Sequence, residues 1–142
     1  MKKYGLGLLI ATSLQLGLSL DVNACTDFRL KATDGTILIT RSMEFAQDLQ
    51  SNLRSSPRGR LFKGVTSNNL PSLSWTSKLG YVYVDGFALD AAFDGMNEAG
   101  LTFEFLYLPG ETQYQTVPSG QDSKVIPYTM FGDWVLGNYK NI

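Results

Sequence analysis

The sequence has no histidine and only one cysteine among its 142 residues. Without histidine, neither a serine–histidine nor a cysteine–histidine catalytic pair can form, and a single cysteine cannot form an internal disulfide. The formal net charge is only -1, and the basic residues are scattered, so the positive field that nucleic-acid binding needs is missing. These absences exclude several classes of hydrolase and set nucleic-acid partners aside.

The remaining composition is that of a folded domain. Hydrophobic residues make up 44% of the chain and aromatic residues 12%, whereas only 18% of the residues are charged. Such a chain can bury a core, unlike a disordered segment. At this length, one domain is the expectation.

The first 24 residues have the pattern of a secretory signal peptide. A short basic start precedes a mostly apolar, uncharged run over residues 4–20, and Val22 and Ala24 stand at the third and first places before a cleavage point. The run is interrupted by polar residues and is shorter than the roughly 20 residues of a transmembrane helix. We predict that residues 1–24 are removed, that the protein is periplasmic or secreted, and that it has no membrane contact after cleavage.

The predicted cleavage point lies immediately before Cys25, the only cysteine. Three interpretations are open: a small buried hydrophobe, a lipoprotein whose cysteine is diacylated, or an N-terminal nucleophile. In the third, the free α-amine of Cys25 takes the thiol proton and later returns it to the leaving amine. This interpretation supplies the base that a histidine-free chain otherwise lacks, and cleavage would then be the activating step.

A hairpin is predicted directly after Cys25. Residues 25–30 alternate in polarity, residues 33–36 have the composition of a turn, and residues 37–40 form a buried-strand run. The far end of the second strand then returns to the start of the first. We therefore expect Arg41 and Glu44 to lie next to the thiol.

The rest of the chain predicts further strands and one helix. Residues 47–73, rich in serine, asparagine and arginine, are predicted to be a surface loop with short ordered pieces. The other predicted elements are strands at 81–84, 87–93 and 101–108, a turn at 94–100, and a helix over 126–135 with Pro127 in its first turn. Asn97 and Gly100 are interpreted as turn residues that shape the hairpin.

Several segments together resemble the choloylglycine hydrolase family, which includes penicillin V acylases and conjugated bile-salt hydrolases. The resemblance covers residues 25–142 and implies an α+β fold, the αββα sandwich of N-terminal-nucleophile hydrolases. The segments that carry it are Cys25-Thr26-Asp27-Phe28, Arg41-Ser42-Met43-Glu44-Phe45, Asp94-Gly95-Met96-Asn97-Glu98-Ala99-Gly100-Leu101, Tyr107-Leu108-Pro109-Gly110, and the stretch from Ile126-Pro127 to Trp134-Val135-Leu136-Gly137-Asn138.

The resemblance also implies roles for individual residues. Cys25 would be the nucleophile, with its α-amine as the base, and Arg41 would favour the thiolate. Glu44 matches a position that is usually aspartate in the family and holds the α-amine; here its side chain is longer. The backbone N–H of Tyr107 would contribute to the oxyanion hole, and its side chain favours aromatic acyl groups.

The implied activity is hydrolysis of a linear amide C–N bond in a small molecule, without a metal or organic cofactor. Phenoxyacetyl amides such as penicillin V come first, then acyl-homoserine lactones and conjugated bile salts. The resemblance also allows for a homo-oligomer of the full-length enzyme. The order of these substrates rests on the Tyr107 side chain and on the predicted export of the protein.

The family's further oxyanion-hole asparagine and second active-site arginine come from a later part of the domain. We therefore expect residues 25–142 to be an N-terminal fragment of the sandwich, with low or no activity and exposed sheet edges when alone. The alternatives are a lipid-anchored binding domain, in which acylation of Cys25 removes the nucleophile and the base, and an inactive fragment that pairs with a homologue through an edge strand.

Overall fold

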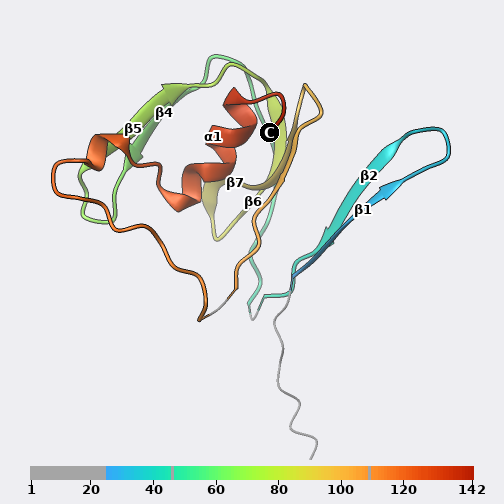
Figure 1. The fold of residues 1–142 in the computed structure, drawn as a ribbon, viewed down its shortest axis with the longest axis horizontal. Coiled ribbons are helices and arrows are strands. Elements are labelled where there is room, and N and C mark those ends of the chain that lie inside the picture. Colours follow the sequence, from blue (N-terminus) through green and yellow to red (C-terminus); the bar gives the residue numbers. More distant parts are fainter. Residues whose placement is uncertain (1–24, 46, 109) are drawn as a thin grey trace, which may run out of the picture.

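The computed structural model describes residues 25–45, 47–108 and 110–142. Within these ranges the chain forms strands joined mostly by short turns, two 3₁₀ turns, and one α-helix near the C-terminal end (Figure 1). The strands are β1 (Thr26–Lys31), β2 (Ile37–Ser42), β3 (Leu53–Ser56), β4 (Leu61–Val65), β5 (Pro71–Thr76), β6 (Tyr81–Gly86), β7 (Leu89–Asn97) and β8 (Thr102–Glu104). The helices are η1 (Asp122–Lys124), η2 (Tyr128–Met130) and α1 (Phe131–Asn138).

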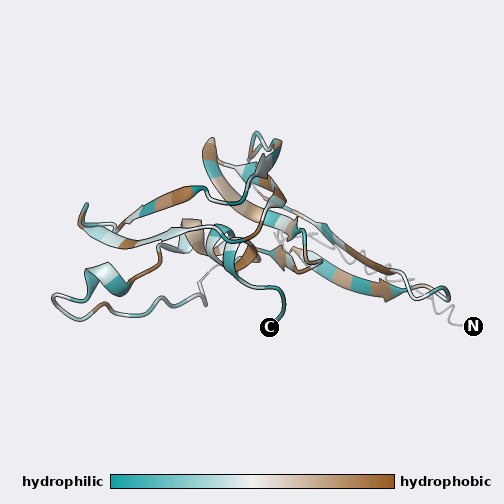
Figure 2. Cartoon of the chain, turned by 90° about the horizontal axis from the view of Figure 1, so that it is seen from above, coloured by the Kyte–Doolittle hydropathy of each residue, from teal (hydrophilic) through white to brown (hydrophobic). Residues whose placement is uncertain are grey.

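The predicted N-terminal hairpin is confirmed. Strands β1 and β2 pair antiparallel, with Thr26 opposite Ser42 and Asp27 opposite Arg41. The backbone N–H of Thr26 also donates to the Ser42 hydroxyl at 3.3 Å. The hairpin projects from the rest of the molecule as a separate two-stranded arm, and hydrophilic and hydrophobic residues mix along it (Figure 2). Its base brings the end of β2 back to Cys25.

The main sheet has four antiparallel strands in the order β3-β6-β7-β8. One row of residues crosses it, because Tyr83 pairs with Gly95 and Gly95 pairs with Phe103. The neighbouring row carries Asp94 opposite Glu104. Since successive side chains of a strand point to opposite faces, the aromatic row and the carboxylate row lie on opposite faces of the sheet.

Helix α1 covers the aromatic face of this sheet and completes the core. Leu136 is fully buried there, in a cluster with Phe62, Tyr81, Tyr83 and Ala92. The helix approaches β7 very closely: a Cβ added at Gly132 would lie 2.0 Å from the carbonyl oxygen of Ala92. Only glycine allows this approach, which lets the short helix pack directly on the strand backbone.

The prediction of a surface loop with short ordered pieces over residues 47–73 was wrong where β3, β4 and the start of β5 form strands. Strand β3 is an edge strand of the main sheet, and β4 pairs with β5 in a separate hairpin. Phe62 of β4 stacks on Trp75 of β5, with ring centroids 5.0 Å apart. The serine and arginine content suggested a loop, but strand pairing uses backbone groups, and the stacked Phe62–Trp75 pair adds a side-chain contact across the β4–β5 hairpin.

Four predicted boundaries also change. Phe87 does not begin a strand; it forms a two-residue turn with Ala88, and both have positive φ angles, 57° and 55°. Strand β7 continues into the predicted turn as far as Asn97, and β8 ends at Glu104, four residues before the predicted end. The predicted helix begins as the 3₁₀ turn η2 after Pro127 and becomes α-helical only at Phe131.

The turn roles of Asn97 and Gly100 are confirmed. The Asn97 side-chain oxygen accepts hydrogen bonds from the backbone N–H groups of Ala99 and Leu101, each at 3.0 Å, and Gly100 has a φ of 85°. The Asn97 amide also donates to the carbonyl oxygens of Leu136 and Tyr139, at 3.0 and 2.6 Å. One buried side chain thus shapes the β7–β8 turn and fastens it to the end of α1.

The observed combination of antiparallel strands and one packed helix agrees with an α+β fold. One helix packed on a sheet is compatible with a fragment of the predicted αββα sandwich, and the four-layer arrangement stays a prediction. Among the described residues, no helix is long and apolar enough to cross a membrane.

Candidate active site

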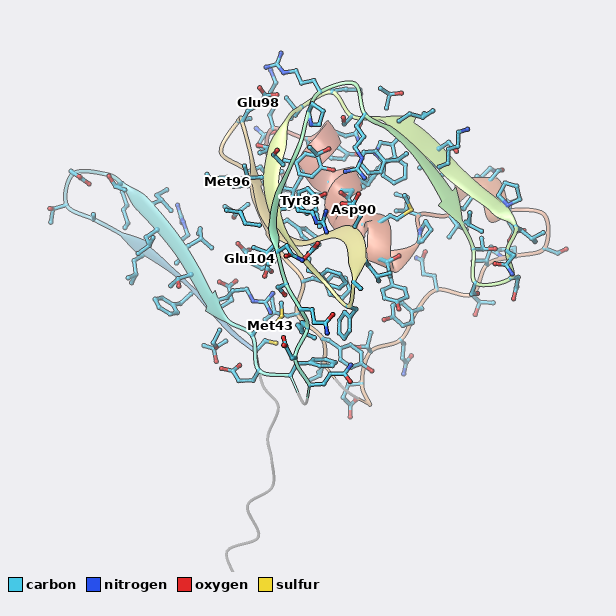
Figure 3. The ribbon with its side chains drawn as sticks, turned by 180° about the vertical axis from the view of Figure 1, so that it is seen from behind. Met43, Tyr83, Asp90, Met96, Glu98 and Glu104 are labelled. Carbon is cyan, nitrogen blue, oxygen red and sulfur yellow. The ribbon has the colours of Figure 1, made fainter. Side chains whose placement is uncertain are left out.

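A cavity of about 370 Å³ opens where the N-terminal hairpin meets the main sheet. Cys25, half-buried, and Arg41 both line it. Met43 also lines it and lies at the base of the hairpin arm, beside the body of the molecule (Figure 3). The structure therefore brings together the predicted nucleophile and the predicted arginine, as the hairpin register indicated.

The remaining wall of the cavity is almost entirely aromatic. Phe93 is buried, whereas the other rings are partly or largely exposed, so the wall has an apolar floor and an accessible rim. Neighbouring ring centroids lie 5.2 to 6.3 Å apart, within the range of favourable aromatic pairs. In order of contact, the rings are those of Phe45, Phe87, Phe93, Phe105, Tyr128 and Tyr114.

The Phe87 ring enters this wall from a strained turn. A φ of 57° is unusual for a residue with a bulky side chain. The conformation is held from two sides, because the Phe87 N–H donates to the carbonyl of Leu49 at 2.8 Å and the ring packs between those of Phe45 and Phe93. Strain of this kind persists only where the surroundings fix it, and it is common in binding sites.

Arg41 is buried beside the cavity and is held by a carboxylate from the main sheet. Its side chain is only 9% exposed, and its Nη1 forms an ion pair with Asp94, which is itself 18% exposed. The same Nη1 donates to the carbonyl oxygen of Phe105 at 3.1 Å, and Nε donates to the carbonyl of Ser42 at 3.4 Å. The remaining nitrogen, Nη2, is buried and has no hydrogen-bond partner among the described residues.

Two carboxylates near Arg41, those of Asp94 and Glu104, are destabilised in their charged form. Burial raises the pKa of Asp94 above its usual value, although the Arg41 guanidinium opposes this shift. Burial also raises the pKa of Glu104, and the charges of Asp27 and Asp94 raise it further. Three carboxylates from three strands therefore face one guanidinium.

The other two predicted site residues are placed differently. Glu44 is exposed and does not line the cavity, and in the described part of the chain it makes no hydrogen bond or ion pair. Tyr107 is 45% exposed and lines the cavity, in the segment after β8. Its backbone N–H has no acceptor among the described residues. The role of each of these residues stays a prediction.

Sequence reasoning missed Asp94 and most of the aromatic wall. Asp94 lay in a segment predicted to be a turn, and the rings come from residues far apart in the sequence. The sequence did contain a signal for these residues, because Phe45, Asp94 and Tyr107 fall inside the segments that carry the family resemblance. In the described ranges, no group of three histidine, cysteine, aspartate or glutamate side chains is arranged to hold a metal ion.

A thiol, a buried guanidinium and an aromatic cavity together form a site suited to acyl transfer through sulfur. The family model of linear amide C-N hydrolases, choloylglycine hydrolase family, matches residues 25–142. The chain therefore belongs to this family of N-terminal-nucleophile hydrolases, which act on linear amide C–N bonds. No curated protein and no solved structure matches the chain.

Proposed function

We propose that the protein is an exported amidase that hydrolyses linear amides of aromatic acids with Cys25 as an N-terminal nucleophile. The observation that carries the proposal is the joint position of Cys25 and Arg41 on one cavity whose wall is a chain of aromatic rings. Removal of residues 1–24 frees the Cys25 α-amine, which a histidine-free chain needs as its base.

The proposed reaction has two steps. The α-amine takes the thiol proton, the thiolate attacks the amide carbonyl, and the backbone N–H of Tyr107 donates to the oxyanion. The C–N bond breaks as the α-ammonium protonates the departing amine, which leaves a thioester on Cys25. Water then attacks this thioester, and the carboxylic acid leaves with regeneration of the thiol.

The aromatic wall favours an aromatic acyl group over a lactone side chain or a steroid. Offset or edge-on contact with several rings suits a flat phenyl group, and each such contact is worth about 0.5–1.5 kcal/mol. A cavity of about 370 Å³ also lies at the small end of ligand pockets. Phenoxyacetyl amides such as penicillin V are therefore the first-ranked substrates, and acyl-homoserine lactones and conjugated bile salts rank below them.

The first test uses the protein recovered from the exported fraction of its natural host. We expect an intact mass that begins at unmodified Cys25, release of phenoxyacetic acid from penicillin V, and a transient thioester visible as an added acyl mass. A parallel sample treated with iodoacetamide is the control, because Cys25 is the only thiol in the sequence. A lipidated Cys25, or equal hydrolysis by the alkylated sample, would contradict the proposal.

The Tyr107 side chain is predicted to contribute to acyl-group selection. Tyr107→Ala should lower kcat/KM for penicillin V about tenfold, because it removes one aromatic contact while the backbone N–H remains. Tyr107→Phe keeps the ring and should stay close to wild type. Comparison with an aliphatic amide provides the check, since equal losses on both substrates would show that the ring does not select aromatic acyl groups.

A further inference from the structure

We infer that Asp94 is a positioning residue that fixes the Arg41 guanidinium so that its free Nη2 is available to the Cys25 thiolate. The inference rests on the proposed function, because it gives Asp94 a task in activating the same thiol. It concerns a residue of the main sheet, whereas Cys25 and Arg41 both belong to the N-terminal hairpin.

The hydrogen bonds of Arg41 show how the guanidinium is fixed. Nη1 is bound twice, by the Asp94 carboxylate and by the carbonyl of Phe105, and Nε is bound by Ser42. These contacts determine the plane of the group and its rotation within that plane. Nη2 is the only nitrogen left, and it is buried without a partner in the part of the chain that the structure describes.

A buried donor without an acceptor is costly, typically about 1–3 kcal/mol, so such groups usually have a task. Arg41 and Cys25 line the same cavity, and a thiolate is an acceptor for Nη2 that exists only in the reactive form of the enzyme. The free N–H groups of Nη2 can thus donate to the negative sulfur that forms at Cys25 during catalysis.

The Arg41–Asp94 ion pair also contributes little net stability to the fold. Asp94 is only 18% exposed, and burial raises its pKa even with the guanidinium beside it. The cost of removing two charges from water offsets much of their attraction, so a buried ion pair is weak support for stability alone. Orientation of Arg41 gives this pair a role that an apolar contact could not fill.

The other carboxylates near the Arg41–Asp94 pair determine where the Arg41 guanidinium turns when Asp94 is replaced. Asp27 of β1 is opposite Arg41 in the hairpin, and Glu104 of β8 is opposite Asp94 in the sheet. Both carboxylates remain when Asp94 is replaced. An Arg41 released from Asp94 can therefore turn toward Asp27 or Glu104 and away from the thiol.

The test compares Asp94→Ala with Asp94→Asn by the pH dependence of iodoacetamide alkylation of the exported protein, read on the peptide that begins at Cys25. Asp94→Ala removes the acceptor for Nη1, so the guanidinium turns away and half-maximal alkylation moves up by about one pH unit. Asp94→Asn keeps an acceptor oxygen and removes a negative charge, so the midpoint stays or moves down. Below both midpoints, the two variants should differ about tenfold in alkylation rate.

The two variants separate positioning from simple neutralisation of charge. If Asp94 only masked the charge of Arg41, both variants would move the midpoint down together, and this result would overturn the inference. Arg41→Lys is the second test: it keeps the charge but cannot bind Asp94 and reach the thiol at once, so its midpoint should rise. An unchanged midpoint in Arg41→Lys would likewise overturn the inference, even if Asp94→Ala fails to fold.

Asp90→Asn is the matched control. Asp90 lies on the same strand as Asp94 and pairs with Arg60 at 2.8 Å, but it does not line the cavity with Cys25. Its replacement should leave the alkylation midpoint unchanged. The alkylation assay needs no substrate, so an exported wild-type protein without amidase activity would contradict the proposed function and still leave the result for Asp94 readable.

Discussion

Cys25→Ala is expected to abolish amide hydrolysis, with a loss of about 10⁴-fold or more in kcat. The substitution removes the only thiol in the chain, and no histidine is present to activate a water molecule or another nucleophile in its place. Hydrolysis of penicillin V, followed by release of phenoxyacetic acid, measures the effect. Cys25→Ser should show nearly the same loss, because an alcohol yields far less of the reactive anion than a thiol at neutral pH.

Glu98→Gln is the control for this experiment. Glu98 pairs with Arg58 on an exposed surface and does not line the cavity. Its replacement should leave kcat within about twofold, since exposed ion pairs contribute little. Retained hydrolysis in Cys25→Ala, with the same circular dichroism spectrum as wild type, would show that another group is the nucleophile.

Asp133→Ala is expected to lower the free energy of unfolding by about 3 kcal/mol. Asp133 is only 1% exposed, and it accepts hydrogen bonds from the Tyr81 hydroxyl at 2.6 Å and from the backbone N–H of Ala92 at 3.1 Å. Removal of the carboxylate leaves both buried donors without an acceptor, at about 1–3 kcal/mol each. Urea titration of wild type and variant measures the difference, and a change below about 1 kcal/mol would contradict the assigned role.

Asp133→Asn separates the hydrogen bonds of this side chain from its charge. Burial raises the pKa of Asp133, so its contribution to stability is present below its unfolded pKa near 4 and is lost as the pH rises through the higher folded value. Asparagine does not titrate. The stability of Asp133→Asn relative to wild type should therefore improve as the pH rises above about 4. A relative stability that falls over this interval would show that burial does not disfavour the charged carboxylate.

Local features of the fold could be predicted from the sequence. The hairpin after Cys25 follows from alternating residues and a turn signal a few positions apart, and its register follows from the length of the turn. Asn97 and Gly100 were identified as turn residues for similar reasons, because their conformations depend on neighbouring positions.

The predictions failed where pairing between distant segments decided the structure. Strands β3, β4 and β5 lie in and beside a segment rich in serine, asparagine and arginine, which hid their short strand patterns; β3 pairs with β6 through the backbone, and Phe62 of β4 stacks on Trp75 of β5. Phe87 appeared to be a strand residue, although β6 and β7 require a turn at this position. In each case, contacts across the structure outweighed local preference.

The sequence by itself determined the chemistry that is available: one thiol after a predicted cleavage site, no histidine, and an arginine that the adjacent hairpin returns to that thiol. Only the tertiary structure decided how that arginine is held and what surrounds it. Asp94 lies 53 positions from Arg41, and the aromatic wall draws rings from segments on both sides of it. Burial of the aromatic rings and desolvation of the ion pair arise only when these segments pack together, so no local pattern in the sequence records them.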